Sequence, residues 1–185
     1  MTAYPLENRQ GLPDGLRILL PLYPRNLWSQ HRNFDGLVAF WLDRHLGFRA
    51  KTARMAAETD ALLDRARDPQ DFAVGLSSLG NHFLHDLHGH HTIEDVHFFP
   101  RLTRMEPRLA LGFDMLETDH QAIDGLLQRF TSAANALLRS PADLTLAAGF
   151  AGELAHITRL LDRHLTDEED LIVPVILDRG PEALD

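Results

Sequence analysis

Cysteine is missing from the sequence, and its absence excludes several kinds of site. Without thiols the chain cannot hold disulfides, thiolate-bound zinc or iron–sulfur clusters. The same absence is typical of proteins from a reducing compartment, so we expect a cytoplasmic protein.

Long apolar runs and excess positive charge are missing as well. No stretch approaches the ~18 uninterrupted apolar residues of a membrane span, and residues 1–12 lack the basic segment and apolar run of a signal peptide. Lysine and arginine number 18 against 27 aspartates and glutamates, which gives a net charge of -9. Such a charge is unsuited to neutralising phosphates. The sequence therefore predicts a soluble protein that binds neither membranes nor nucleic acid.

Strict alternation of polar and apolar residues, the pattern of a half-buried strand, is not found in any window, so an all-α fold is expected. The 185 residues fit one domain. Residues 1–23 contain Pro5, Pro13 and Pro21 and are predicted to form an irregular N-terminal arm. Residues 24–180 are predicted to form the folded unit.

Four long segments of the chain have apolar residues at helical spacing. They run from Arg25 to about Gly47, over residues 71–103, from about Pro107, and onward from a turn at residues 140–143. Residues 48–67 are rich in alanine, arginine and leucine and are predicted to form a short extra helix between the first two long ones. Four long amphipathic helices with short links favour an up-down-up-down four-helix bundle.

Histidine is abundant and repeats with a pattern. Six of the 11 histidines lie between His82 and His97, and histidine is the commonest metal ligand. Two segments share a His, a Glu four positions later and a Pro ten positions later: His90, Glu94 and Pro100 in the first, and His164, Glu168 and Pro174 in the second. Residues 31–37 also match residues 120–126, beginning with His31 and His120. The sequence thus predicts a duplicated pair of helix hairpins, with 59 residues between the histidines of the first and 44 in the second. The 15 extra residues match the segment around 48–67.

The spacing of these residues predicts a metal site inside the bundle. Residues four apart lie on one helix face, so each His–Glu pair reaches one point. Both pairs fall on apolar faces, where carboxylates are costly unless they are paired, protonated or bound to metal. We expect two histidines on each of two metal ions, with both glutamates bridging the ions. The predicted ligands are His31, His90, Glu94, His120, His164 and Glu168.

Iron is the expected metal, because two bridging carboxylates in a helix bundle suggest di-iron chemistry. Zinc and manganese also suit mixed nitrogen and oxygen ligands and stay as alternatives.

Other polar residues near these positions have open roles. Asp35 and Asp124 follow His31 and His120 by one turn and are read as acceptors that orient the imidazoles, as solvated residues, or as extra ligands. His97 is read as a cavity-lining residue. The remaining histidines are read as surface or cavity-mouth residues: His82, His85, His88, His91 and His156. The pair His91 and Asp95 is the shifted alternative to His90 and Glu94. In the acidic run of residues 167–170, only Glu168 is expected to point inward.

The predicted ligand set resembles the hemerythrin-like, or HHE cation-binding, family, over roughly residues 25–178. Residues 94–100 and 168–174 are similar to its two signature segments. The chain departs from oxygen-carrying hemerythrin, whose third helix supplies two histidines one turn apart, because Asp124 follows His120 here. The last carboxylate, Glu168, also follows its histidine by four residues instead of five. The chain is therefore more similar to the broader bacterial HHE group.

The resemblance implies a non-haem di-iron protein that binds or senses O2 or NO, or handles iron. With two histidines, two bridging carboxylate oxygens and one further bridging oxygen, each iron would be five-coordinate and open to a small ligand. Open positions favour reaction with peroxide, NO or O2 over reversible storage. An oxidoreductase that consumes peroxide or NO, and a bundle with a structural mono- or dinuclear zinc or manganese site, are the alternatives. No general base is legible, so the sequence leaves the question of catalysis, and the oligomeric state, open.

Overall fold

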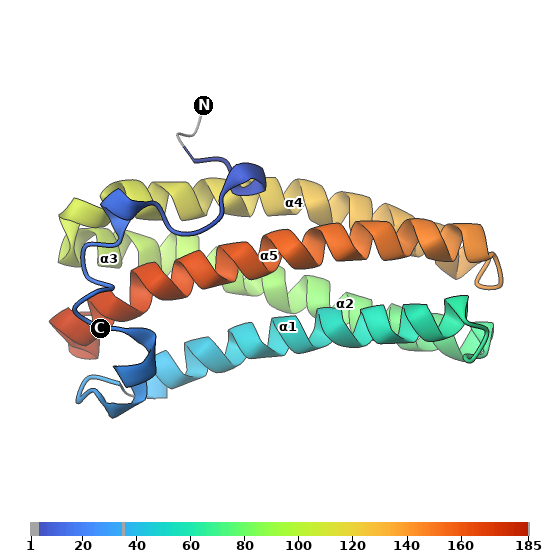
Figure 1. Cartoon of the computed structure of the whole chain (residues 1–185), viewed down its shortest axis with the longest axis horizontal. Coiled ribbons are helices and arrows are strands. Elements are labelled where there is room, and N and C mark those ends of the chain that lie inside the picture. The colour runs from blue at the N-terminus through green and yellow to red at the C-terminus, as the bar shows by residue number, and fades with distance from the viewer. Residues whose placement is uncertain (1–3, 35, 185) are drawn as a thin grey trace.

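Four long helices pack side by side in the computed structural model, which describes residues 4–34 and 36–184 (Figure 1). They are α1 (Gly36–Leu63), α2 (Pro69–Ile93), α4 (Ala110–Arg139) and α5 (Leu144–Arg179). A π-helical segment, η4 (Glu94–Phe98), and the short α3 (Phe99–Met105) prolong α2, and the 3₁₀ turn η5 (Pro107–Leu109) leads into α4. Around the bundle α1 lies between α2 and α5, and α4 lies between the same two helices. The predicted all-α bundle is confirmed, and no strand occurs in the described residues.

The short links between the helices are fixed by capping residues. The side chain of Asp68 accepts hydrogen bonds from the backbone N–H groups of Gln70 and Asp71 at the start of α2. Asp143 caps the start of α5 in the same way, so the turn predicted at residues 140–143 is confirmed. At the end of α5, Gly180 has a φ of 87°, a conformation that glycine adopts without strain.

The extra helix expected over residues 48–67 is wrong as a separate element. Gly47 does not end the first helix, and α1 continues without a break to Leu63. Phe48, Met55 and Leu62 are all buried on one face of this continuation. Their burial outweighs the cost of about 1 kcal/mol for glycine inside a helix.

The first helix also begins later than predicted. Residues Arg25–Gln30 form a 3₁₀ helix, η3, and α1 starts only at Gly36. Before η3 the chain forms the irregular arm, with the short 3₁₀ turns η1 (Leu6–Asn8) and η2 (Asp14–Leu16). The arm lies along α4 and α5 (Figure 1) and buries four leucines, Leu6, Leu12, Leu16 and Leu19. A last 3₁₀ turn, η6 (Pro181–Leu184), follows α5.

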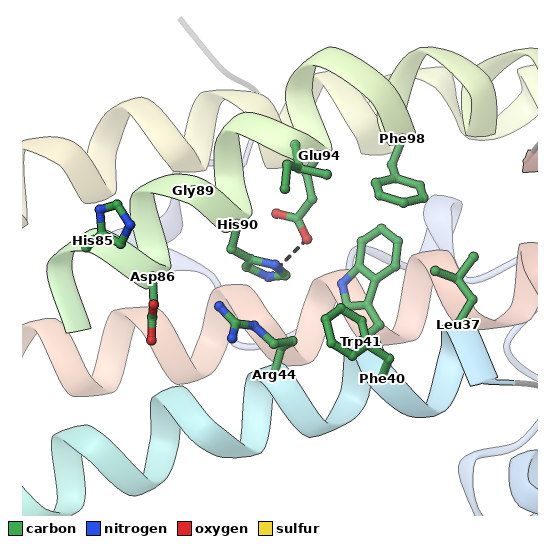
Figure 2. Close-up of a pocket in the computed structure, with 11 residues that line it drawn as sticks. Leu37, Phe40, Trp41, Arg44, His85, Asp86, Gly89, His90, Glu94 and Phe98 are labelled. Atoms are coloured by element: carbon green, nitrogen blue, oxygen red, sulfur yellow. Dashed lines mark ion pairs between the residues drawn. The ribbon is translucent and has the colours of Figure 1, made fainter. Parts of the chain in front are cut away.

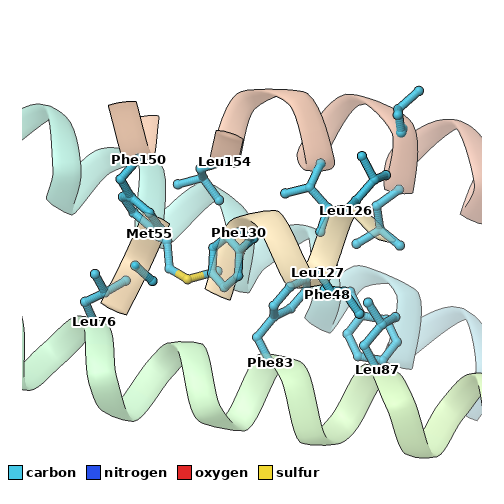
Figure 3. Close-up of a cluster of buried hydrophobic side chains, with 14 of the residues drawn as sticks. Phe48, Met55, Leu76, Phe83, Leu87, Leu126, Leu127, Phe130, Phe150 and Leu154 are labelled. Carbon is cyan, nitrogen blue, oxygen red and sulfur yellow. The ribbon is translucent and has the colours of Figure 1, made fainter. Parts of the chain in front are cut away.

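The interior of the bundle is divided into two apolar clusters. One fills the end near the α1–α2 and α4–α5 links, with Phe48, Phe83, Phe130 and Phe150 at its centre (Figure 3). The other fills the opposite end, where the arm adds its leucines to residues such as Trp28 and Phe113. No described helix is long and apolar enough to cross a membrane.

Between the two clusters each long helix contributes polar residues to a buried layer. Along α1, His45 lies between Trp41 of one cluster and Phe48 of the other. On α4, His120 lies between Leu116 and Ile123. The same interruption occurs on α2 and α5. A shared polar layer at mid-height of a bundle is where side chains from facing helices build metal sites.

Candidate metal centre

Two groups of potential metal ligands lie in the polar layer. The first contains His45, His90, Glu94 and Glu168, and the second contains His91, His120 and His164. Within each group the candidate ligand atoms lie within 4.8 Å of one another. Two ligand atoms on opposite sides of one ion, each ~2.1 Å from the ion, are separated by slightly less than this distance of 4.8 Å. Each group therefore has the dimensions of a single ion's coordination shell.

The two glutamates of the first group also face the second group. Glu94 places Oε1 3.0 Å from Nε2 of His90 and Oε2 3.6 Å from Nε2 of His120. Glu168 places Oε1 3.4 Å from Nε2 of His45 and Oε2 3.4 Å from Nε2 of His164. Each carboxylate thus offers one oxygen to each group, which is the arrangement of a carboxylate that bridges two cations.

Several of these inward-facing atoms are buried without a hydrogen-bond partner. They are both carboxylate oxygens of Glu94, Oε2 of Glu168, and Nε2 of His91, His120 and His164. Buried polar atoms are nearly always satisfied, so six orphaned ligand atoms at one point need an explanation. A pair of cations explains them, because every one of these atoms is a metal ligand type. The donor set therefore fits metal ions held by nitrogen and oxygen.

The geometry of α2 explains how adjacent histidines serve different groups. Successive helix residues point about 100° apart, and α2 packs between α1 and α4. His90 therefore faces His45 on α1, with 3.0 Å between their Nε2 atoms, while His91 stacks on His120 of α4 at a ring distance of 3.9 Å. Glu94 follows one turn later, between the two directions, and reaches both groups.

Outer carboxylates hold three of the imidazoles by their other ring nitrogen. Nδ1 of His45 lies 3.0 Å from Glu169, and Nδ1 of His120 lies 2.7 Å from Asp95. Nδ1 of His164 lies 3.4 Å from Asp119. An Nδ1–H that donates to a carboxylate turns the Nε2 lone pair inward and makes it more basic, as in many metal sites.

Opposite pKa shifts separate the two glutamates in the protein without metal. Burial raises the pKa of Glu94 well above its usual range, and the nearby charge of Glu168 adds to the rise. Burial also acts to raise the pKa of Glu168, but His45 and His164 outweigh it and leave the pKa lowered. In the absence of metal, bound protons therefore offset part of the negative charge of the two carboxylates. Metal binding must displace these protons.

The histidines are divided in a similar way. Burial lowers the pKa of His90 to about 3 and that of His91 well below its ordinary value, so both are neutral and ready to ligate. Burial acts to lower the pKa of His164 as well, but Asp119 and Glu168 raise it to about 9. His164 therefore carries a proton near neutral pH that a metal ion would replace.

Five of the six predicted ligands meet in the polar layer: His90, Glu94, His120, His164 and Glu168. His31 belongs to neither group. It lies at the end of η3, where its ring packs edge-on against Tyr23 and its Nδ1 accepts a hydrogen bond from the backbone N–H of Asn33. The structure places His45 in the layer where the sequence pattern placed His31.

The sequence also contains evidence for His45 as the ligand, but the match of residues 31–37 with residues 120–126 favoured His31 instead. His45 continues the buried stripe of Val38, Trp41 and Phe48 at helical spacing. It also lies 45 residues before His90, close to the 44 that separate His120 from His164. With His45 as the partner, the two hairpins have nearly equal length and the supposed insertion of 15 residues disappears.

Several expectations for the neighbouring polar residues are corrected. His91 is buried in the layer, so the alternatives His90 and His91 both reach it, and Asp95 supports His120 instead of pairing with His91. His97 is exposed and does not line the layer, whereas the exposure of Asp124 agrees with its reading as a solvated residue. In the acidic run, Asp167 and Glu169 are buried together with Glu168. Asp35 lies outside the described residues.

The other histidines lie outside both groups. His82, His85 and His88 are exposed on α2, as expected. His156 is partly exposed and pairs with Glu7 of the arm at 3.1 Å.

Trp41 closes the layer on the side of α1. Its indole N–H donates a hydrogen bond of 2.6 Å to Oε1 of Glu168. Beside it a cavity of about 260 Å³ opens between α1 and α2, with His90 and Glu94 in its wall (Figure 2). The His45 group is thus the one that the cavity approaches from outside.

The comparison with protein families agrees with this geometry. A family model described as the hemerythrin HHE cation binding domain matches residues 25–176. No curated protein and no solved structure gives a significant match. The matched region contains all seven residues of the two buried groups and most of the chain. The chain belongs to the hemerythrin HHE cation-binding domain family.

Proposed function

We propose that this protein is a non-haem di-iron protein in which Glu94 and Glu168 bridge two iron ions. His45 and His90 hold one ion, and His91, His120 and His164 hold the other. The observation that carries the proposal is the placement of each glutamate, with one oxygen toward each group of imidazoles. Zinc and manganese suit the same ligands, but a carboxylate-bridged pair inside a helix bundle favours iron.

The two proposed positions differ in how many side chains complete them. One has three imidazoles and the other has two, and each of the two carboxylates directs one oxygen toward each position. The five-imidazole set revises the expectation of two open irons, because by this count the two-histidine position has more room for an outside ligand. The cavity between α1 and α2 reaches this position through His90 and Glu94.

Binding of a small diatomic ligand, O2 or NO, is the function that this asymmetry favours. The iron pair would supply the redox chemistry when it is bound, and the chain supplies a mostly apolar surrounding. Trp41, held by its hydrogen bond to Glu168, lies at the approach to the two-histidine position. A ligand bound there would lie against this indole.

A second candidate is an oxidoreductase that consumes peroxide or NO. The observation in its favour is the same cavity, since it connects the two-histidine position with solvent. The two candidates share the metal site and differ in turnover. Rapid loss of added peroxide by the iron-loaded protein supports the oxidoreductase, and a stable, reversible O2 adduct supports the carrier or sensor.

Elemental analysis and absorption spectroscopy of freshly purified protein test the metal site. Two irons per chain and a near-ultraviolet charge-transfer band that shifts with azide or NO are expected. Glu94→Ala and His164→Ala are expected to lose metal, whereas Asp124→Ala, an exposed acid on the same helix as His120, retains both ions. Full metal content in the first two variants contradicts the assignment, and spectra that ignore added ligands favour a structural metal.

A further inference from the structure

The cavity between α1 and α2 has more apolar wall than a diatomic ligand needs. Its volume is about 260 Å³. Figure 2 shows Trp41, Phe40 and Leu37 on α1, facing His90, Glu94 and Phe98 on α2 and η4. Pockets for small organic molecules combine such apolar walls with a few convergent polar groups.

Two large apolar side chains at this cavity are unusually exposed. Phe40 on α1 is 63% exposed, and Ile93 at the end of α2 is 50% exposed. They belong to the two helices that border the opening, and both line the cavity. An apolar molecule in the cavity would bury part of both side chains, and this burial of apolar surface would stabilise its binding.

Gly89 leaves space in the cavity wall. It lies inside α2, where glycine costs up to about 1 kcal/mol relative to alanine. A Cβ atom added at this position meets no other atom within 4 Å. A larger side chain here would therefore extend into open space and obstruct the cavity without a clash.

The charged residues of the cavity leave one cation available. The carboxylate of Asp86 is already paired with Lys51 at 2.8 Å. Arg44 lies over the ring of Phe48, 5.6 Å from its centre, and has no ion-pair partner among the residues that the structure describes. The guanidinium of Arg44 is thus the group in the cavity best suited to a carboxylate, which it can bind with two parallel hydrogen bonds.

We propose that this cavity binds a small organic monocarboxylate, with its carboxylate on Arg44 and its apolar chain against Trp41, Phe40 and Ile93. The proposal does not depend on the identity of the metal, because none of these contacts is made by a metal ion. A carboxylate held there would lie beside the two-histidine position and limit access to it. Its binding is a property of the cavity and can be measured with and without metal.

Isothermal titration calorimetry of the metal-loaded protein with octanoate, 1-octanol and acetate tests the proposal. Octanoate is expected to bind at least tenfold more tightly than either of the other two, since octanol lacks the charge and acetate lacks the chain. Metal-free protein is expected to keep the same order. Equal binding of acetate and octanoate, or no binding of octanoate, overturns the proposal.

Variants assign the two ends of the ligand. Arg44→Gln is expected to weaken octanoate binding about tenfold, as for the loss of one charge-assisted interaction, and to change octanol binding less than about twofold. Phe40→Ala is expected to weaken both ligands alike. Unchanged octanoate binding in Arg44→Gln would show that Arg44 does not hold the carboxylate. A shift in the absorption of the iron pair on adding octanoate would place the carboxylate on the metal. Either result overturns the proposal.

Gly89→Leu obstructs the cavity and is expected to reduce binding of both ligands at least tenfold. Gly149→Leu is the matched control, because Gly149 is an exposed position in α5 where an added Cβ also meets no atom within 4 Å. Metal content is measured in both variants to verify that the neighbouring His90 still functions. Undiminished octanoate binding by Gly89→Leu excludes the cavity as the site.

Discussion

Glu94 and Glu168 are the residues whose burial is hardest to explain without a cation. Their side chains are 1% and 0% exposed, and three of their four oxygens have no hydrogen-bond partner. A buried carboxylate that lacks a partner costs several kcal/mol. The surrounding imidazoles compensate only part of this cost, because burial keeps His90 and His91 neutral. Two divalent cations between the glutamates would remove this cost. The burial of the two carboxylates therefore favours the binding of cations in the layer.

The exchange of His31 for His45 can be tested by a matched pair of substitutions. His45→Ala is expected to lose at least one of two bound irons per chain, because one ion keeps only His90 as an imidazole ligand. His31→Ala is expected to retain both, because its ring contacts Tyr23 and lies outside the ligand groups. Iron content per chain measures the difference.

Circular dichroism of both variants provides the control for folding. Replacement of a buried histidine leaves a space, so a moderate loss of thermal stability in His45→Ala is expected as well. Loss of iron in His31→Ala with full retention in His45→Ala would reverse the assignment.

At the scale of single residues, the sequence predicted five of the seven residues in the two groups of potential metal ligands. Four of the five have the His-x-x-x-Glu spacing, which is a local property of one helix and can be read directly, and His120 was found from the match of residues 120–126 with residues 31–37. His45 and His91 depend instead on the exact start of α1 and on which neighbour α2 faces, and neither is encoded in a short motif. The supporting carboxylates Asp95 and Asp119 come from contacts between helices, so no local pattern announces them.

The π-helical segment η4 is the element that adjusts α2 to the metal layer. The backbone N–H of Phe99 bonds to the carbonyl of Glu94, five residues back. The extra residue shifts the buried face, so that Phe99 and Leu102 are buried after Glu94. Pro100, which has no N–H, follows at the start of α3, where a missing donor is best tolerated. Such π turns are frequent at functional sites.

Deletion of Val96 tests the role of this segment. Val96 is 60% exposed, and its removal takes out the one residue that distinguishes a π turn from an α turn. We expect helix content to be retained and metal content to fall, because Glu94 would rotate away from one of the two groups. Far-ultraviolet circular dichroism and iron analysis measure the two effects. Normal iron content in the deletion variant would show that the π turn does not position Glu94.

The junction between α3 and η5 depends on one buried acid. Glu106 accepts hydrogen bonds from Arg108 at 2.6 and 2.7 Å and from Arg179 at 2.9 Å. Arg108 and then Arg179 lower the pKa of Glu106 to about 2 against an ordinary 4.5. The ionised side chain therefore stabilises the fold fully above pH 4.5, and this stabilisation is lost as the pH falls through about 2.

Glu106→Gln is expected to lower the free energy of unfolding by about 1 kcal/mol at pH 7, since both arginines are largely exposed. The difference from the wild type should shrink as the pH falls from 4.5 to 2. Urea unfolding at several pH values measures it. Glu153→Gln, whose pair with Arg129 lies on the surface, is the control and should change stability by less than about 0.5 kcal/mol. A pH-independent difference would contradict the role of the charge.

At the level of elements, the number and type of the long helices followed from the sequence because their apolar spacing is strong over many turns. Their limits depend on packing between helices as well as on local propensity. Gly47 suggested a helix end, but local propensity yielded to the burial of Phe48 and Met55. The segment before α1 has apolar residues at helical spacing, yet it forms a 3₁₀ turn that packs Trp28 into the second cluster.

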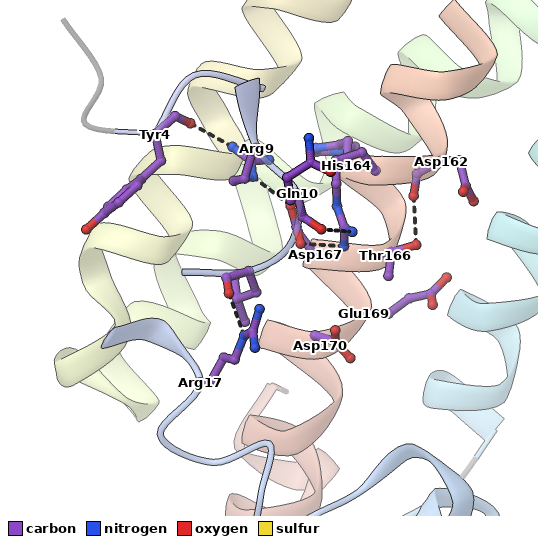
Figure 4. A network of polar contacts seen from close by, with 12 residues as sticks. Tyr4, Arg9, Gln10, Arg17, Asp162, His164, Thr166, Asp167, Glu169 and Asp170 are labelled. Atoms are coloured by element: carbon purple, nitrogen blue, oxygen red, sulfur yellow. Dashed lines mark hydrogen bonds and ion pairs between the residues drawn. The ribbon is translucent and has the colours of Figure 1, made fainter. Parts of the chain in front are cut away.

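On the scale of the whole molecule, the N-terminal arm closes the polar layer on the side of α4 and α5. Arg9, which precedes the family-matched region, is buried and forms an ion pair with Asp119 of α4. It forms a second ion pair, at 2.6 Å, with Asp167 of α5 (Figure 4). Asp119 in turn faces Nδ1 of His164. One arginine thus joins the arm, two helices and a proposed metal ligand, although composition alone predicted only an irregular segment.

Arg9→Gln tests whether the arm is part of the folded unit. In the metal-loaded protein, where His164 is neutral, the substitution leaves Asp119 buried without a cation, and Asp167 keeps only Arg163 at 2.6 Å. Breaking a buried pair in this way costs about 3–5 kcal/mol, which urea unfolding of the metal-loaded protein would measure. Arg17→Gln, in the same arm, removes a 3.5 Å pair with the exposed Asp14 and a hydrogen bond of 2.5 Å to the carbonyl of Leu12, and should cost about 1 kcal/mol. Because Asp119 also orients His164, Arg9→Gln should release iron to a chelator faster than Arg17→Gln does. Equal stability and equal iron release in the two variants would mean that the bundle holds its metal layer without the arm.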